Sequence, residues 1–413
     1  SYKMTTYYLS RIKDNKILQK LKYKNILIGD LIYDNYLRTK FRSTVDLKSK
    51  EFFNSFQESI LLILYWEKYL RQNNVSAVIT SHSVYHNAIL ARLAIHKNIP
   101  VYLSGITKTD FLNKKRLLLT DYKVFWNSFF SLKKKKQYLY FRKSKSELNL
   151  KFKNSIKKKF TEMYMPEGNK LLNDKLDTFL EVKNKNLFNK NKINVIIYAH
   201  CFYDAPHDSG EFLFEDFYKW LSHLADISKK TDYHWYLKEH PHTLNSKLNN
   251  ITIKKILMNS NIKVLDHNIN NNEILSSKVD CILTVNGSSA YEFAYHGVPV
   301  IISHPNSIYK KFKFCHQPSS IKKYDELIFN IKKIKKKRLN IIRKEVEKFY
   351  AITYLPNWNF FNKIFYYIQK YKNEMNTALI YYLWIKDFKK KNELKIIKDL
   401  KNFINKKNMR LIE

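Results

Sequence analysis

A hydroxyl-rich turn between residues 284 and 300 carries the strongest chemical signal in the sequence. An apolar run ends at Thr284, and Asn286-Gly287 then leads into Ser288 and Ser289, which open a helix-like segment. The first turn of a helix has backbone N–H groups without partners, so these N–H groups and the serine hydroxyls can together hold a phosphate. The pattern therefore predicts a phosphate-binding turn that contains Asn286, Gly287, Ser288 and Ser289.

Glu292 follows the serine pair at helical spacing. The spacing places its carboxylate on the same helix face as Ser288 and Ser289, where it can accept hydrogen bonds from ribose hydroxyls. An ordinary capping box has the same pattern, with a serine at the start of the helix and a glutamate in its first turn. Periodicity alone favours neither interpretation.

A cation and an imidazole close a second apolar run. In the segment from Trp235 to Pro241 the proline ends the strand pattern, which places Lys238 and His240 at the carboxyl end of a strand. Both side chains can contact phosphate oxygens, lysine as a point charge and histidine as a donor. A lone Lys-x-His-Pro is a weak signal, because proline is common after strands, so its weight comes from its combination with the serine pair.

The loop from Ala199 to Glu211 is unusually rich in ionisable side chains. It contains His200, Asp204, His207 and Asp208, a density that a purely structural loop seldom needs. Asp204, His207 and Asp208 are candidates for a general base or for a group that orients one, and His200 is an acceptor-side candidate. The mixture of His and Asp also fits a metal site, but no Glu-x-x-His or paired-His helical spacing occurs, so we predict no metal.

Polar residues also follow two apolar runs near the N-terminus. Gly29-Asp30 and Asp34 follow the first run, and Ser81-His82-Ser83 follows Ala77–Thr80. We expect His82 to be catalytic and Asp30 to lie on the acceptor side of the same cleft. The alternative for Asp30 is a structural role as the N-cap of the next helix.

The candidate residues follow short apolar runs that alternate with helical patterns. This alternation predicts parallel sheets with helices on both faces. The expected N-terminal strands are Ile26–Ile28, Ala77–Thr80, Val101–Ser104 and Tyr122–Trp126, around a helix over Lys50–Gln72. The expected C-terminal strands are Asn194–Tyr198, His234–Leu237, Lys263–Leu265, Val279–Thr284 and Pro299–Ile302.

Length and composition predict three parts. We expect an α/β fold with two Rossmann-like, doubly wound domains that face a cleft: residues 1–190, which include a helical connection from about 131, and residues 191–345. Residues 346–413 are Lys-rich and amphipathic and are expected to form helices that pack back on the domains, with a kink at Pro356.

Composition argues against several functional classes. The 413 residues include 75 Lys+Arg and 36 Asp+Glu, a formal net charge of +39, but no motif of a nucleic-acid reader accompanies this charge. Attraction to an anionic membrane face or to phosphorylated substrates explains it as well. No apolar run is long enough to cross a bilayer, and Ser1–Lys16 lacks the layout of a secretory signal. Three cysteines without metal-type spacing fit a reducing cytoplasm.

Together these motifs resemble the C-terminal half of GT-B-type glycosyltransferases of bacterial capsule and surface polysaccharide synthesis. The resemblance rests on Lys238-x-His240-Pro241 and on Ser288-Ser289 with Glu292, ahead of Gly297-x-Pro299. These two motifs are similar to those of Kdo and sialic acid transferases and of polyol-phosphate polymerases, which use cytidine-nucleotide donors. The resemblance covers residues 191–305 well and the N-terminal half only in outline.

The resemblance implies a cytoplasmic enzyme, peripheral on the inner membrane, that moves a sugar from a nucleotide donor to a growing surface glycan or glycolipid. Lys238, His240, Ser288 and Ser289 would hold the donor phosphates and Glu292 the ribose, with no cofactor required. The family's catalytic residue does not align with a unique aspartate here. Alternatives are transfer of a phospho-polyol from a cytidine diphosphate donor, a nucleotide-sugar epimerase and a non-catalytic binding module.

Overall fold

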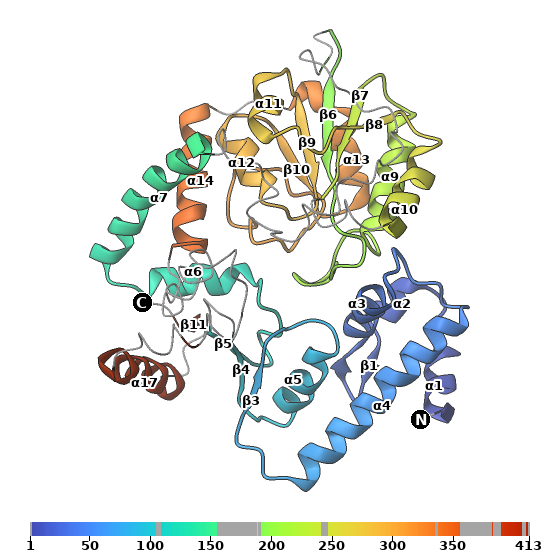
Figure 1. The fold of residues 1–413 in the computed structure, drawn as a ribbon, viewed down its shortest axis with the longest axis vertical. Helices are drawn as coiled ribbons and strands as arrows, with labels where there is room; N and C mark the ends of the chain where they lie inside the picture. Colours follow the sequence, from blue (N-terminus) through green and yellow to red (C-terminus); the bar gives the residue numbers. More distant parts are fainter. Residues whose placement is uncertain are drawn as a thin grey trace.

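A computed structural model describes residues 2–104, 109–154, 188, 191–240, 247–334, 338–355, 382, 390–406 and 410–411. The fold is of the α/β class, as predicted, and has two main sheets (Figure 1). We refer to residues 2–130 as the N-terminal half and to residues 191–355 as the C-terminal half. Of the helices in the described ranges, none is long and apolar enough to cross a membrane.

The C-terminal half contains a five-stranded parallel sheet. Its strands are β6 (Asn194–Tyr198), β7 (His234–Lys238), β8 (Ile262–Val264), β9 (Cys281–Thr284) and β10 (Val300–Ile302), in the spatial order β10-β9-β6-β7-β8. This is the doubly wound order, in which the chain reverses its direction of winding between β6 and β9. All five predicted strands are confirmed. The carboxyl ends of β6 and β9 form the topological switch point, where such sheets bind ligands.

The C-terminal strands form because their apolar side chains are buried on both faces of the sheet. Ile196, Ile282 and Ile302 pack on one face and Val195, Leu283 on the other. Helices cover both faces: α12 (Ser289–Tyr295) and α14 (Leu339–Thr353) pack on the first, and α9 (Phe217–Ser228) and α13 (Ile321–Phe329) on the second. The short α10 (Lys247–Leu257) and α11 (Asn271–Ser276) complete this half (Figure 1).

The N-terminal half has a mixed sheet and departs from the expected parallel one. Strands β3 (Val78–Thr80) and β4 (Val101–Ser104) are parallel, whereas β5 (Thr109–Leu112) and β11 (Arg410–Leu411) are added antiparallel, in the order β11-β5-β4-β3. The expected first strand lies outside this sheet, because β2 (Ile26–Leu27) pairs with β1 (Lys22–Tyr23) in a hairpin.

The strand predicted over Tyr122–Trp126 is wrong, because these residues lie in helix α6 (Tyr122–Phe130). The side chain of Asp121 accepts a hydrogen bond from the backbone of Lys123 and caps this helix. The buried residues Val124, Phe125 and Phe129 have helical rather than alternating spacing. The segment Tyr122–Phe130 contains six apolar or aromatic residues, and a run this short fits a buried strand as well as a helix.

The rest of the N-terminal half is helical. Its helices are α1 (Tyr2–Leu9), α2 (Asn15–Gln19), α3 (Gly29–Lys40), α4 (Lys50–Gln72) and α5 (Asn87–His96). The predicted helix over Lys50–Gln72 is confirmed, and Ser49 caps it. Helix α3 is buried from its first residue, where a β-carbon on Gly29 would lie 1.8 Å from the carbonyl oxygen of Leu18. Only glycine allows this approach, and it brings the next residues of α3 into the interior.

Helix α7 (Lys134–Asn154) forms the described part of the expected helical connection. It packs along α14, which also contacts α6 and α12 (Figure 1). Near the C-terminus, α17 (Lys390–Asn405) lies beside β11, which returns to the N-terminal sheet. The expected kink at Pro356 lies outside the described residues.

Candidate active site at the junction of the two halves

A buried carboxylate–imidazole pair joins the two halves. Helix α3 supplies Asp34, and the loop from residue 199 to residue 216, which we call the β6–α9 loop, supplies His207. Their side chains are only 1% and 5% exposed, and Nδ1 of His207 lies 2.5 Å from Oδ1 of Asp34. The backbone N–H of His207 also donates to Oδ2 of Asp34 at 3.3 Å. The carboxylate therefore holds His207 at two points, its ring and its backbone.

The neighbouring residue of α3 makes a second contact with the same loop. The hydroxyl of Tyr33 donates to Oδ2 of Asp216 at 2.5 Å, and Asp216 also caps α9 through the backbone of Lys219. The Tyr33 ring meets the His207 ring edge to face, with centroids 5.5 Å apart. Two consecutive side chains of α3 thus attach the β6–α9 loop to the N-terminal half.

Burial and the mutual charge of the pair set its protonation. Burial by itself disfavours the charged form of His207, but the Asp34 carboxylate outweighs this effect and the pKa of His207 is raised. Burial raises the pKa of Asp34 to about 6, although His207 opposes that rise. The second ring nitrogen of His207, Nε2, is buried and has no hydrogen-bond partner among the described residues. In the neutral ring, with the proton on Nδ1, this nitrogen carries the lone pair.

The switch point of the C-terminal sheet gathers a second set of polar groups. His200 follows β6, and its Nε2 lies 3.4 Å from Oγ1 of Thr284 and accepts the backbone N–H of Asn286 at 3.5 Å. Burial, followed by the nearby charge of His240, lowers the pKa of His200 to about 3. The imidazole is therefore neutral at physiological pH.

Gly287 keeps open a small space between these groups. A β-carbon at Gly287 would lie 3.0 Å from Oγ1 of Thr284, 3.4 Å from Oγ of Ser289 and 3.8 Å from Nε2 of His200. The three polar atoms thus face one point where glycine has no side chain. The hydroxyl of Tyr309 donates to the Gly287 carbonyl at 2.9 Å and holds the turn in place.

Ser209 lies two residues after His207 in the β6–α9 loop and contacts the switch point. Its hydroxyl donates to Oδ1 of Asp208 at 2.9 Å and accepts from Nδ2 of Asn286 at 3.2 Å. Burial raises the pKa of Asp208 to about 6, and Thr120 of the N-terminal half donates to the Asp208 carbonyl at 2.6 Å. The β6–α9 loop therefore contacts both the N-terminal half and the turn between β9 and α12 (residues 285–288), which we call the β9 turn.

The other catalytic candidates lie at the rim of this junction. Asp204 is exposed, and its Oδ1 accepts the hydroxyl of Tyr85 from the N-terminal half at 2.8 Å. His82 is also exposed, bonds Ser81 at 2.8 Å, and its ring centroid lies 6.5 Å from that of Tyr85. The structure thus brings both His82 and Asp204 next to Tyr85.

Two of the donor-side candidates already have partners within the protein. Burial lowers the pKa of Lys238 to about 8, and its ammonium donates to the carbonyl of Ile269. Glu292 accepts Lys151 of α7 at 2.8 Å and Asn271 at 3.0 Å. Ser288 is exposed and Ser289 is buried. The phosphate and ribose roles of these residues stay predictions.

The acceptor-side candidate Asp30 is occupied by an arginine. Both of its carboxylate oxygens accept the Arg92 guanidinium at 2.6 Å, and Arg92 also donates to the carbonyl of Leu27. The pair is buried within the N-terminal half and connects α3 to α5. These contacts serve packing, and the acceptor-side role of Asp30 remains a prediction.

Three residues of this junction were not predicted from the sequence as site residues: His304, Tyr33 and Asp216. His304 follows β10, is 1% exposed and stacks on Phe212. Burial, then the charges of His207 and His200, lowers the pKa of His304 to about 3. The segment Ser303-His304-Pro305 repeats the strand-His-Pro pattern of the His240 motif, which was a usable signal. Tyr33 and Asp216 have no local signal, because each is defined by its contact with the other half.

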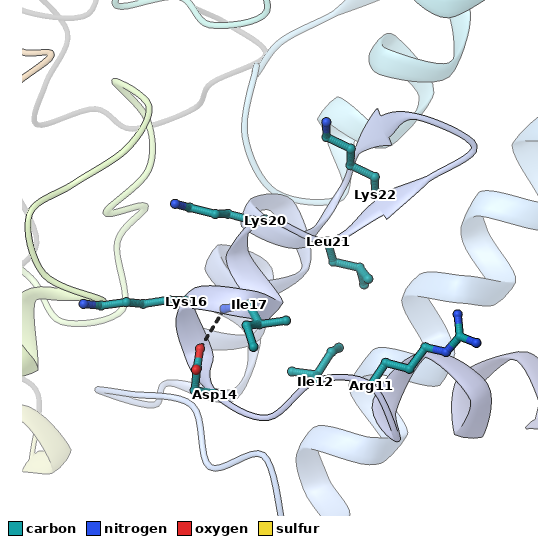
Figure 2. Close-up of a pocket in the computed structure, with 8 residues that line it drawn as sticks. All are labelled: Arg11, Ile12, Asp14, Lys16, Ile17, Lys20, Leu21 and Lys22. Carbon is teal, nitrogen blue, oxygen red and sulfur yellow. Dashed lines mark hydrogen bonds between the residues drawn. The ribbon is translucent and has the colours of Figure 1, made fainter.

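A hollow of about 490 Å³ lies elsewhere on the N-terminal half, and Figure 2 shows the residues that line it around α2 and β1. Its lining includes four cations, but none of the predicted site residues: Arg11, Ile12, Asp14, Lys16, Ile17, Lys20, Leu21 and Lys22. Lys20 forms an exposed ion pair with Glu211 of the β6–α9 loop at 2.9 Å. Within the part of the chain that the structure describes, no three His, Cys, Asp or Glu side chains are arranged to hold a metal ion.

No model of a known protein family and no curated protein sequence matches the chain. The structure is similar to a crystal structure of UDP-GlcNAc 2-epimerase from Neisseria meningitidis bound to UDP-GlcNAc, with 12% sequence identity and a TM-score of 0.30. That similarity covers 72% of this chain and 79% of the epimerase chain. At this identity and TM-score it supports no inference about function.

Proposed function

We propose that the chain is a glycosyltransferase that moves a sugar from a nucleotide-activated donor to a hydroxyl group of a surface glycan or glycolipid. The observation that carries this proposal is the buried Asp34–His207 pair, which both halves assemble and which one loop links to the switch point of the C-terminal sheet. Glycosyl transfer needs a base for the acceptor hydroxyl and polar groups for the departing phosphate.

The switch-point residues would bind the nucleotide diphosphate or monophosphate of the donor. The hydroxyls of Thr284 and Ser289 face the space that Gly287 leaves. Hydroxyl donors at such a point can follow the negative charge that develops on the leaving phosphate. The chain's net charge of +39 would attract an anionic donor, and also an anionic membrane surface that presents a glycolipid acceptor.

His207 would act as the base. In the step that we propose, the proton of the acceptor hydroxyl passes to Nε2 of His207 while the acceptor oxygen bonds to the anomeric carbon of the donor sugar. The bond from that carbon to the phosphate oxygen breaks, and the nucleotide leaves with the electron pair. We prefer His207 to Asp204 because Nε2 of His207 is buried within the β6–α9 loop and has no partner among the described residues. Asp204 is exposed and already accepts a hydrogen bond from the hydroxyl of Tyr85.

A panel of nucleotides tests donor binding directly. We expect one of CMP, CDP, UDP and GDP to raise the melting temperature, because a ligand at 100 times its Kd that binds only the native protein stabilises it by about 2.7 kcal/mol. Product analysis then identifies the reaction class. A glycosidic linkage supports the proposal, a phosphodiester indicates phospho-polyol transfer, and consumption of the donor sugar to an epimer without acceptor indicates an epimerase. If none of the four nucleotides changes the melting temperature, the proposed donor site is wrong.

Replacing Gly287 by alanine should weaken nucleotide binding about tenfold or more. The added β-carbon would lie 3.0 Å from Oγ1 of Thr284 and 3.4 Å from Oγ of Ser289, where the phosphate would contact these hydroxyls. A loss of about 1.4 kcal/mol of binding free energy is a tenfold rise in Kd. Titration calorimetry with the nucleotide that the panel selects measures the change in Kd. An unchanged Kd would place the nucleotide away from the β9 turn.

A further inference from the structure

We infer that Asp34, on helix α3 of the N-terminal half, is the positioning residue for His207, so that the base of the proposed reaction exists only where the two halves meet. This inference rests on the proposed function for its catalytic meaning. Its structural content, a ring orientation and a tautomer of His207 set by Asp34, stands on the geometry of the pair alone.

The hydrogen bonds of His207 select one tautomer of its ring. Nδ1 lies 2.5 Å from a carboxylate oxygen of Asp34, and a carboxylate only accepts, so the ring proton is on Nδ1. The backbone N–H of His207 donates to the other carboxylate oxygen and orients the carboxylate toward Nδ1. In the neutral ring this leaves the lone pair on Nε2, which is the nitrogen that must receive the acceptor proton.

The second ring nitrogen of His207 points to a ligand rather than to a structural role. Buried side-chain nitrogens usually have hydrogen-bond partners, but among the described residues Nε2 of His207 has none, and neither have those of His296 and His304. In His207 the other ring nitrogen is held by a buried carboxylate. His86 provides a contrast within the same protein, because its Nε2 lies 2.9 Å from the hydroxyl of Ser59 between α4 and α5. A histidine that served only to join the halves could have been satisfied in the same way.

The Tyr33–Asp216 hydrogen bond provides a control, because it holds α3 to the β6–α9 loop at 2.5 Å without contacting the ring nitrogens of His207. Removing the Tyr33 hydroxyl therefore weakens the junction and leaves the Asp34 contact in place. A second comparison is Asp325, which pairs with His223 at 2.7 Å between α13 and α9, far from the junction in the sequence.

Several charged groups face His207, and their sum determines how its basicity responds to mutation. Asp34 is the nearest, Asp30 and Asp216 add negative charge from α3 and the start of α9, and His304 faces the ring from the end of β10. Asp30 is neutralised by Arg92, so Asp34 has the largest charge effect on the ring. Without the Asp34 carboxylate the pKa of His207 should fall, because burial then acts without its main opposition.

Asp34→Asn in the full chain tests the inference. With release of free nucleotide from CMP- and UDP-sugars as the assay, we expect a loss of kcat of about 10²–10⁴-fold with the donor KM nearly unchanged. The rising limb of the pH–rate profile should move to lower pH, since the base titrates there. Tyr33→Phe and Asp325→Asn should keep that limb in place. If Tyr33→Phe lowers kcat as much as Asp34→Asn and neither moves the limb, Asp34 only joins the halves.

A spectroscopic measurement decides the positioning role without turnover. In nitrogen-15 spectra of the wild-type protein, we expect the neutral His207 ring to be protonated at Nδ1, and Asp34→Asn to populate the other tautomer. A wild-type ring protonated only at Nε2 overturns the inference even if the variant does not fold. Conversely, an Nδ1-protonated ring in a protein that turns over no nucleotide sugar would sustain the positioning role and refute the proposed function.

Discussion

Replacing His207 by alanine is expected to lower the rate of sugar transfer by about 10²–10⁴-fold, the range that a positioned general base contributes. The reason is that Nε2 of His207 is buried and has no hydrogen-bond partner among the described residues, while Asp34 holds the ring through its other nitrogen. Donor binding should persist, because the proposed phosphate-binding residues Thr284 and Ser289 lie around the turn after β9. Steady-state kcat and a nucleotide titration measure the two effects separately.

The design needs a variant that separates catalysis from packing, because the His207 ring is buried. His207→Gln fills a similar volume and keeps a group that can donate to Asp34, but it cannot take a proton. His223→Ala is the matched control, since His223 also pairs with an aspartate, Asp325, at 2.7 Å, but on the outer side of α9. We expect both His207 variants to lose turnover and His223→Ala to retain it.

The competing candidate for the base is the exposed His82, and the same assay compares the two. A large loss in His82→Ala together with near-normal turnover in His207→Gln would move the base to the rim, where Tyr85 connects His82 to Asp204. Equal, moderate losses in both would contradict a single positioned base.

The C-terminal half was predictable because local patterns determine it. Its strands are apolar on both faces, and such runs between helical segments leave few alternatives. The switch point follows from the strand order, and the residues singled out after β6 and β9 do meet there through His200, Thr284 and Asn286. The role of each hydroxyl was not predictable, because it depends on distances between turns that are far apart in sequence.

The N-terminal half depends on contacts between residues far apart in the sequence, which local patterns do not predict. Strand β11 has two residues and pairs with β5 across about 300 positions of sequence, so neither its length nor its neighbours signal a strand. The Asp34–His207 contact joins residues 173 positions apart, and although the loop of His207 is rich in ionisable residues, nothing in it indicates Asp34 as the partner. Lys238 was placed correctly at the end of β7, but burial directs its ammonium to the Ile269 carbonyl.

The second large effect concerns stability and involves the same strand β11. Asp110 on β5 is fully buried and accepts two guanidinium groups, Arg116 at 2.9 Å and Arg410 of β11 at 2.7 Å. Burial lowers the pKa of Arg116, although Asp110 opposes this shift. The lone carboxylate thus compensates two buried cations, and it connects the C-terminal strand to the N-terminal sheet.

Asp110→Asn should therefore lower the free energy of unfolding by about 3–5 kcal/mol, the usual result of removing one member of a buried ion pair. Arg410→Met should cost less, because Asp110 keeps Arg116 and one buried cation is removed with its charge. Asp226→Asn, which breaks an exposed pair with Lys229, should change the free energy by about 0–1 kcal/mol. Urea unfolding followed by circular dichroism measures the three variants. An Asp110→Asn loss no larger than that of Asp226→Asn would show that Arg116 and Arg410 find water or other partners, and that the β5–β11 junction does not depend on this carboxylate.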